Sequence, residues 1–172
     1  MKTFISAGII VGLVLSIAVA QGNAELDRLD EKISSHLATQ FPGWHHKRVE
    51  PVAPSSTVLV QFWSSANRVV KVSVAIHHST EEAKREIQDF LKFRQPQELR
   101  GFGDEAFAAE REGRTIVFRR GRYVIYLSTV ADIEGDPDAP NMSQVERATR
   151  QKAEVQRIGK EFARQLSLME FQ

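Results

Sequence analysis

Apolar side chains recur along the chain with two different periods, and each period predicts a type of secondary structure. Between Glu25 and Phe41 they recur at every third or fourth position among charged residues, which predicts an amphipathic helix that Pro42 ends. Residues 57–64 and 69–77 alternate apolar and polar positions, which predicts an antiparallel hairpin with one buried and one partly wet face. The apolar positions on one face of each strand are Val58, Val60 and Phe62, and then Val70, Val72, Val74 and Ile76.

The second half of the chain predicts further helices and strands. Ser79 with Glu82, and Ser143 with Glu146, have the spacing of a capping box, which predicts a helix after each serine. The apolar stripe of the last helix comprises Val145, Ala148, Val155, Ile158, Phe162, Leu166 and Met169. Stretches rich in β-branched and aromatic residues predict strands over 106–110, 115–119 and 123–130. The predicted order is α-β-β-α-β-β-β-α, which indicates an α+β fold, an antiparallel sheet of about five strands with helices packed on it.

The N-terminal segment has the pattern of an export signal. Lys2 precedes an uncharged, mostly aliphatic run from Phe4 to Ala20, and small residues at its end predict cleavage after Ala20, or alternatively after Ala24. An uncleaved membrane anchor is the other interpretation, because the run is close to the shortest length that spans a bilayer. The sequence therefore predicts a periplasmic or secreted protein with a single α+β domain over residues 25–172.

Composition narrows the classes of function. The sequence contains no cysteine, which excludes disulfides, thiol catalysis, thiolate metal sites and a lipid-modified cysteine. Removal of Lys2 with the export segment lowers the net charge from +1 to zero, so we expect no nucleic-acid partner. The most basic stretch contains Arg111, Arg114, Arg119, Arg120 and Arg122. We interpret these arginines as charged hairpin tips that discourage pairing between sheet edges, with contact to an anion as a minor role.

Two groups of residues are candidate metal ligands. The histidines form the pairs His45–His46 and His77–His78, and imidazole is the common ligand where thiolates are absent. Against chelation, adjacent residues on a strand point to opposite faces. An acidic loop presents alternate carboxylates that suit calcium, although the closing glutamate of an EF-hand is missing. These carboxylates are Asp132, Glu134, Asp136 and Asp138. The other interpretation of this loop is a solvated connector of turn-forming residues.

Residues 101–110 read GFGDEAFAAE, a candidate for either an active site or a turn. Gly101 and Gly103 predict backbone with positive φ, and Asp104 is suited to accept N–H groups of its own turn, with Glu105 facing solvent. The stretch lacks the third glycine of a dinucleotide fingerprint. No serine-nucleophile, zinc-protease or phosphate-loop motif occurs elsewhere, so we expect neither catalysis nor a cofactor. We interpret GFGDEAFAAE as a structural turn.

The longer segment GFGDEAFAAEREGRTIVFRRGRYVIYLST, residues 101–129, resembles a pattern in exported bacterial domains. In that pattern a G-x-G-D-E-A turn precedes a hairpin with an R-x-G-x-x-V tip. The segment, together with the helix that begins near Ser79, is similar to the extracellular sensor domain of mycobacterial serine/threonine kinases and to related small lipoproteins. Those sensor domains usually carry disulfides, which this chain lacks. The resemblance implies an envelope-side α+β module with a ligand-binding cleft, and it carries over no catalytic residue.

Together these patterns predict an exported, non-catalytic binding or interaction module. Its expected partner is an unknown small ligand or an envelope protein. The alternatives are a calcium- or zinc-dependent exported protein, and a structural protein tethered to the membrane if the N-terminal segment is retained.

Overall fold

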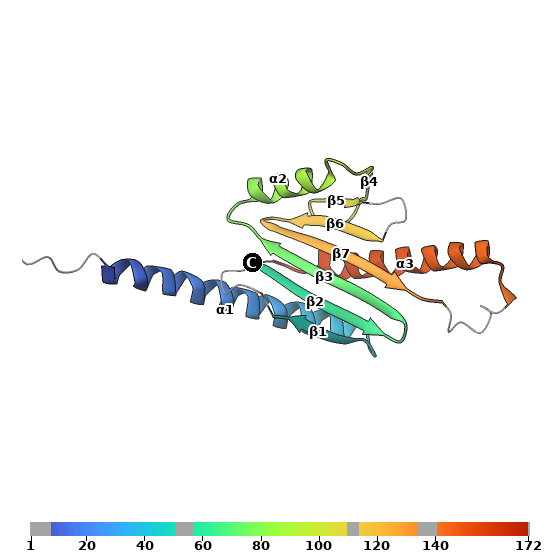
Figure 1. Cartoon of the computed structure of the whole chain (residues 1–172), viewed down its shortest axis with the longest axis horizontal. Coiled ribbons are helices and arrows are strands. Elements are labelled where there is room, and N and C mark those ends of the chain that lie inside the picture. Colours follow the sequence, from blue (N-terminus) through green and yellow to red (C-terminus); the bar gives the residue numbers. More distant parts are fainter. Residues whose placement is uncertain (1–7, 51–56, 110–113, 134–140, 172) are drawn as a thin grey trace, which may run out of the picture.

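The structure is a computed structural model that describes residues 8–50, 57–109, 114–133 and 141–171, with the backbone alone for residues 8–23. Within these ranges the chain forms three helices and one seven-stranded sheet (Figure 1). In chain order the elements are α1 (Gly8–Gln40), β1 (His45–Val49), β2 (Val58–Ser65), β3 (Arg68–Ile76), α2 (Thr80–Leu91), β4 (Gln97–Glu98), β5 (Glu105–Ala108), β6 (Thr115–Arg120), β7 (Tyr123–Ala131) and α3 (Gln144–Ser167). The predicted α+β class is confirmed, with a larger sheet than the sequence pattern predicts.

The two strands that the sequence pattern misses lie at the edges of the sheet. The strand order is β1-β2-β3-β7-β6-β5-β4, and all neighbours pair antiparallel. The β1 sequence HHKRV has no alternating apolar pattern, and β4 is only two residues long. An edge strand pairs on one side and often carries charged side chains, so it leaves a weak signal in the sequence.

Helices α1 and α3 cover one face of the sheet, here called the inner face (Figure 1). Trp63 of β2 and Phe162 of α3 are fully buried there, and Phe41 stacks on Phe162 with ring centroids 4.0 Å apart. The buried Gln61 donates from Nε2 to Asp30 Oδ1 at 2.6 Å and accepts from Trp63 Nε1 at 2.9 Å. This polar chain ties α1 to β2 without leaving the buried amide of Gln61 unpaired.

Helix α2 covers part of the opposite face, here called the outer face, where it packs on β6 and β7. Ala83 and Ile87 of α2 contact a second, smaller buried cluster that includes Val117 and Val124. The outer face of β1, β2 and β3 instead carries large apolar side chains that remain partly exposed. The sheet is therefore closed on one side and half open on the other.

The β2–β3 hairpin confirms the predicted alternation but places its two apolar stripes on opposite faces. Phe62 pairs with Lys71, and Trp63 pairs with Val70. The Val70 stripe of β3 therefore faces the inner core with Trp63, while Val58 and Phe62 lie on the outer face. Alternation shows which residues share a face, but bulky apolar residues on both sides of β2 hide which face is buried.

Helix α1 is continuous from Gly8, and its N-terminal part extends beyond the sheet (Figure 1). The predicted amphipathic stripe is confirmed, because Leu26, Leu29, Ile33 and Leu37 are buried. Leu26 is the first α1 residue with a described, buried side chain, and both predicted cleavage positions precede it. Among the residues with described side chains, no helix is both long and apolar enough to cross a membrane.

Candidate functional site

The GFGDEAFAAE stretch forms a turn that fits closely against β6. Gly101 and Gly103 have φ values of 84° and 57°, the left-handed conformation that the sequence predicts. A Cβ atom on Gly103 would lie 2.3 Å from the carbonyl oxygen of Arg119, whereas one on Gly101 would meet nothing within 4 Å. Gly103 is therefore needed both for its backbone conformation and for its close approach to β6.

The two carboxylates of this turn bind a buried arginine. Asp104 accepts from Arg119 Nη1 at 2.7 Å and from the backbone N–H of Gly121 at 2.8 Å. The prediction that Asp104 binds its own turn is therefore wrong, since its partners lie at the β6–β7 turn. Glu105, predicted to face solvent, is only partly exposed and accepts from Arg119 Nε at 2.7 Å. Asp104 and Glu105 both form ion pairs with the one buried guanidinium of Arg119, which indicates a structural link between two turns.

The structure does not bring the two predicted histidine pairs together. The pair His45–His46 lies in β1 near the β2–β3 turn. There the His46 ring stacks on the Trp63 ring, with the ring centroids 4.9 Å apart. His77–His78 follows β3 at the other end of the hairpin, and His77 Nε2 lies 2.7 Å from Glu86 Oε2, outside hydrogen-bond geometry. In the described part of the chain, no group of three or more His, Asp or Glu side chains is placed to hold a metal ion.

Of the four carboxylates in the predicted acidic loop, the structure describes Asp132 alone. The backbone N–H of Asp132 donates to Asn67 O at 3.0 Å, which joins the end of β7 to the β2–β3 turn. Glu134, Asp136 and Asp138 lie outside the described residues. The calcium interpretation of this loop therefore stays a prediction.

Helix α3 extends past the elements on which it packs. Its C-terminal part is buried against the sheet, as predicted for Val155 and Phe162. Val145 and Ala148, predicted to belong to the same apolar stripe, are exposed. The helix has 24 residues and so spans about 36 Å, whereas the nine residues of β7 span about 30 Å. The N-terminal turns of α3 therefore overhang the edge of the covered region.

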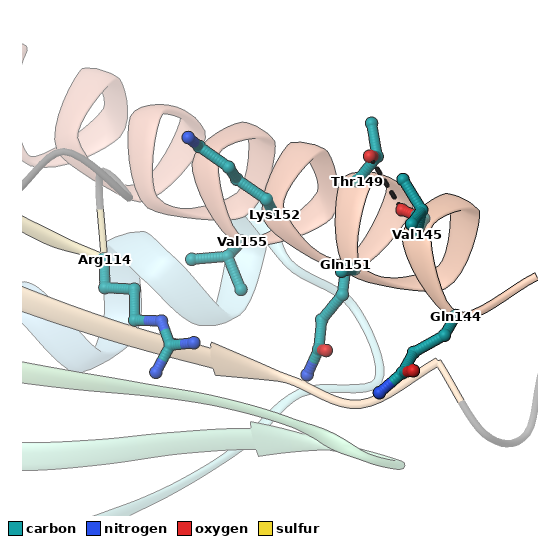
Figure 2. Close-up of a pocket in the computed structure, with 8 residues that line it drawn as sticks. Arg114, Gln144, Val145, Thr149, Gln151, Lys152 and Val155 are labelled. Carbon is teal, nitrogen blue, oxygen red and sulfur yellow. Dashed lines mark hydrogen bonds between the residues drawn. The ribbon is translucent and has the colours of Figure 1, made fainter.

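A cleft of about 470 Å³ lies beneath this overhang, between the N-terminal half of α3 and the start of β6 (Figure 2). We call it the α3 cleft. Its lining residues are Arg114, Gln144, Val145, Ala148, Thr149, Gln151, Lys152 and Val155. Figure 2 shows Arg114 reaching in from the strand side, while Gln151 and Val155 point from α3 toward the strands. Lys152 extends along the helix at the rim.

Hydrogen bonds fix the geometry of the α3 cleft. Gln151 Nε2 donates to Ala131 O at 2.7 Å, which holds α3 against the end of β7. Thr149 Oγ1 donates to Val145 O at 2.8 Å, a bond within the first turns of α3. The N–H of Thr129 donates to Arg114 O at 2.9 Å and fixes the backbone from which the Arg114 side chain extends.

Two cations line the α3 cleft. They are Arg114 and Lys152, and the lining residues that the structure describes include neither Asp nor Glu. Glu146, on the first turn of α3, forms a capping box with Ser143, as predicted. Its hydrogen bonds with the Ser143 side chain and backbone lower the pKa of the Glu146 carboxyl, so its charge is retained at the helix cap. Arginine, lysine and amide groups beside a small apolar surface suit a ligand that carries a carboxylate or phosphate.

A second cavity, of about 500 Å³, lies between α1 and the C-terminal residues Glu170 and Phe171. Here the Tyr123 hydroxyl donates to Glu25 at 3.1 Å, and Arg122 also binds this carboxylate. Burial raises the pKa of the Tyr123 phenol. The Glu25 carboxylate of this cavity is thus held by Arg122 and Tyr123.

Comparison with protein-family models, with curated proteins and with solved structures gave no match to this chain. The site therefore has to be argued from its own residues.

Sequence reasoning does not identify the α3 cleft, although it singles out Arg114 as part of the basic stretch. Lys152, Gln144 and Gln151 carry no motif. One signal is nevertheless present in the sequence: the apolar stripe predicted for α3 is longer than the strands predicted to face it. A helix longer than its sheet must leave one end without a packing partner, and Val145 marks that end.

Proposed function

We propose that this protein is an exported, non-catalytic binding module whose ligand carries an anionic group and occupies the α3 cleft. The observation that carries the proposal is that Arg114 and Lys152 both line the cleft, where none of the described lining residues is an Asp or Glu. A guanidinium and an ammonium bind carboxylate or phosphate oxygens through charge-assisted hydrogen bonds. Val145 and Val155 supply an apolar wall for the rest of the ligand.

The two carboxylates of the GFGDEAFAAE turn, the candidates for a catalytic role, are already bound within the fold. Asp104 and Glu105 are both engaged by Arg119, so neither is positioned as a base beside the cleft. Their geometry supports a fold-stabilising role for the turn. The proposal therefore assigns ligand contact to α3 and the start of β6.

A thermal-shift titration with inorganic phosphate, succinate and benzoate tests the proposed site. A probe at 100 times its dissociation constant should raise Tm by about 5–10 °C, because binding to the folded state stabilises it by about 2.7 kcal/mol. Lys152→Ala and Arg114→Ala should each weaken binding about tenfold, the loss expected for one charge-assisted hydrogen bond. The matched controls Lys160→Ala and Arg85→Ala remove exposed cations on α3 and α2 outside the cleft.

The proposal is wrong if no probe moves Tm, or if the cleft variants bind as tightly as the controls. Calcium, zinc and EDTA in the same assay test the two metal predictions. A Tm that rises with calcium or zinc and falls with EDTA would favour the metal-dependent alternative.

Export, with or without a tether, is the second part of the proposal. The apolar run of Phe4 to Ala20 supports it, and the uninterrupted helix α1 gives a retained segment a rigid connection to the domain. The intact mass of the protein from the cell envelope distinguishes the cases. Loss of residues 1–20 or 1–24 identifies a cleaved signal, whereas the full mass identifies an anchor and the tethered alternative. Recovery of the full-length chain from the cytosol alone would contradict export.

A further inference from the structure

Several partly exposed apolar residues lie near one another on the open part of the outer face. The strand register places Val49, Phe62, Val69 and Val130 on this face, because Val49 pairs with Val60, Ser64 with Val69, and Val69 with Val130. Their exposed fractions are 40%, 40%, 36% and 59%. Single exposed apolar residues are ordinary, but a contiguous patch of them is typical of an interaction surface.

Lysines flank the centre of this patch. Phe62 pairs with Lys47 of β1 on one side and with Lys71 of β3 on the other. The outward-facing positions of β1, β2 and β3, all of them described, contain no Asp or Glu. The surface is therefore apolar at its centre and cationic beside it. We call it the Phe62 face, defined by Lys47, Val49, Phe62, Val69, Lys71 and Val130.

Helix α2 shows what kind of element fits this side of the sheet. It lies on the same face, with Ala83 and Ile87 four residues apart against the strands. Its Glu86 reaches down to accept from the Tyr126 hydroxyl and to lie beside His77. An apolar stripe with a carboxylate at its margin thus packs on strands that present a hydroxyl and an imidazole group.

The spacing of the sheet leaves room for a second helix beside α2. Packed helices lie about 8–10 Å apart, and two strand spacings amount to about 10 Å. α2 packs on β6 and β7, so a neighbouring helix would lie over β2 and β3. That position is the Phe62 face. The covered and open parts are continuous, because Ala75, buried in the cluster beneath α2, pairs with Val58 at the margin of the open part.

We propose that the Phe62 face binds an acidic amphipathic helix of a partner protein. The apolar stripe of that helix packs on Phe62 and Val69, and its carboxylates pair with Lys47 and Lys71. The helix completes the outer layer that α2 begins. This inference is independent of the α3 cleft, which lies beneath α3 on the inner side.

Two other occupants fit the charges less well. In a second copy of this chain, the exposed end of α3 offers Val145. Its one carboxylate, Glu146, is outnumbered by Arg147, Arg150 and Lys152, so this end is positive on balance and would oppose the lysines of the Phe62 face. An anionic membrane surface usually binds clusters of about four to eight basic residues, more than this face supplies. A partner protein with an acidic helix is the occupant that the charges favour.

Site-specific photo-crosslinking in the cells that express the protein tests the proposal. The full chain carries p-benzoylphenylalanine at position 62 or, as a matched control, at position 93. Phe93 is 90% exposed and lies outside the Phe62 face, whereas Phe62 is 40% exposed. If crosslinking depended on exposure alone, position 93 would therefore give the higher yield. We expect a crosslinked protein from position 62 whose attached segment, mapped by mass spectrometry, is acidic and has apolar residues at i, i+3 and i+4.

Charge reversal provides the second measurement. Lys47→Glu combined with Lys71→Glu should lower the yield of the position-62 crosslink at least about fivefold, the loss expected from two rim ion pairs. Lys84→Glu combined with Lys160→Glu changes the net charge equally at exposed positions elsewhere and should leave the yield unchanged. Circular dichroism confirms that each variant is folded. Crosslinking to phospholipid, to a second copy of this chain, equally from both positions, or from neither, overturns the proposal.

Discussion

The two faces of the sheet differ in what their apolar residues do. On the inner face, α1 and α3 bury Trp63 completely, and even the polar Gln61 is enclosed and hydrogen-bonded. On the outer face, α2 encloses a small cluster around Ile87, while Phe62 and its neighbours remain partly exposed. The comparison indicates that the inner face supplies most of the stability of the fold. The outer face holds apolar surface that folding alone does not use.

Adjacent residues of β2 provide the sharpest test of this difference and the largest expected effect. Trp63→Ala should lower the free energy of unfolding by about 3–5 kcal/mol, because it leaves a cavity in the inner core and removes the donor to Gln61 Oε1. Phe62→Ala, one residue away on the outer face, should lower it by about 1 kcal/mol or less. Urea unfolding followed by circular dichroism measures both. Equal losses would show that the outer face is covered in solution and that the contrast between the faces is wrong.

The next largest effect concerns the turn that closes the sheet beside β6. Gly103→Ala should cost about 2–4 kcal/mol, because the new Cβ would need both a positive φ and space that the Arg119 carbonyl occupies. Gly101→Ala should cost only about 1 kcal/mol, since it has the positive φ without the contact. Asp104→Ala should be intermediate, because it removes one partner of the buried Arg119 guanidinium. If Gly103→Ala and Gly101→Ala lose the same stability, the close approach to β6 is absent.

The sequence predicts the helices of this fold better than its sheet, for a physical reason. A capping box is local, and Ser143 with Glu146 forms one in the structure. At α2, Ser79 Oγ accepts from the Glu82 N–H as predicted, although the Glu82 carboxylate accepts from the N–H of His78. Strand β1 is held by pairing with β2, a contact distant in sequence that leaves no pattern in HHKRV.

The candidate sites depend even more on packing between distant segments. The glycines at 101 and 103 reveal a turn because positive φ is a property of single residues. The partner of Asp104 lies on the neighbouring strand β6, fifteen residues further along the chain, so Arg119 is not recognised before the register of β5 and β6 is known. The α3 cleft arises because a long helix overhangs a shorter sheet. The Phe62 face depends on which side of β2 is covered, and alternation leaves that undetermined.

Alkaline pH should weaken the outer face through Tyr126. Burial beneath α2, and then the hydrogen bond and negative charge of Glu86, raise the pKa of the Tyr126 phenol above its usual value. The folded state therefore holds this proton more tightly than the unfolded state does. The associated stability is fully present below about pH 10 and is lost at up to about 1.4 kcal/mol per pH unit as the pH rises further.

Urea unfolding between pH 8 and pH 11 measures this effect in the parent protein and in Tyr126→Phe. The variant should lose less stability over this range and should keep only the dependence due to Tyr123, whose phenol pKa burial also raises. Absorbance at 295 nm, which reports tyrosinate, should rise only above pH 10 in the folded parent, since the chain has two tyrosines. Equal alkaline slopes in parent and variant would contradict a tyrosine buried by α2.

Acidic pH should weaken the inner face by a smaller amount, at the rim where α3 meets the β2–β3 turn. Glu154 of α3 accepts from Arg157 at 2.8 Å and lies 3.0 Å from Arg68 of β3. The hydrogen bond with Arg157 lowers the pKa of the Glu154 carboxyl. Its contribution is therefore present above the usual glutamate pKa and is lost as the pH falls through the lowered value. Because both arginines are partly exposed, we expect about 0.5–1 kcal/mol at pH 7.

The stability of Glu154→Gln measures this contribution, and Glu161→Gln is the control on the same helix. The Glu161 carboxylate lies 3.6 Å from Arg164, so its ion pair stays within α3. Glu154→Gln should be less stable than the parent at pH 7. The two should be equally stable near pH 2, where the Glu154 carboxyl of the parent is protonated in both the folded and the unfolded state. The control should differ little at either pH, because an exposed pair along one helix contributes only a few tenths of a kcal/mol. Equal effects of the two variants would mean that Arg68 does not bind α3. The attachment of α3 to the sheet would then rest on the apolar core and on the hydrogen bond from Gln151 to Ala131.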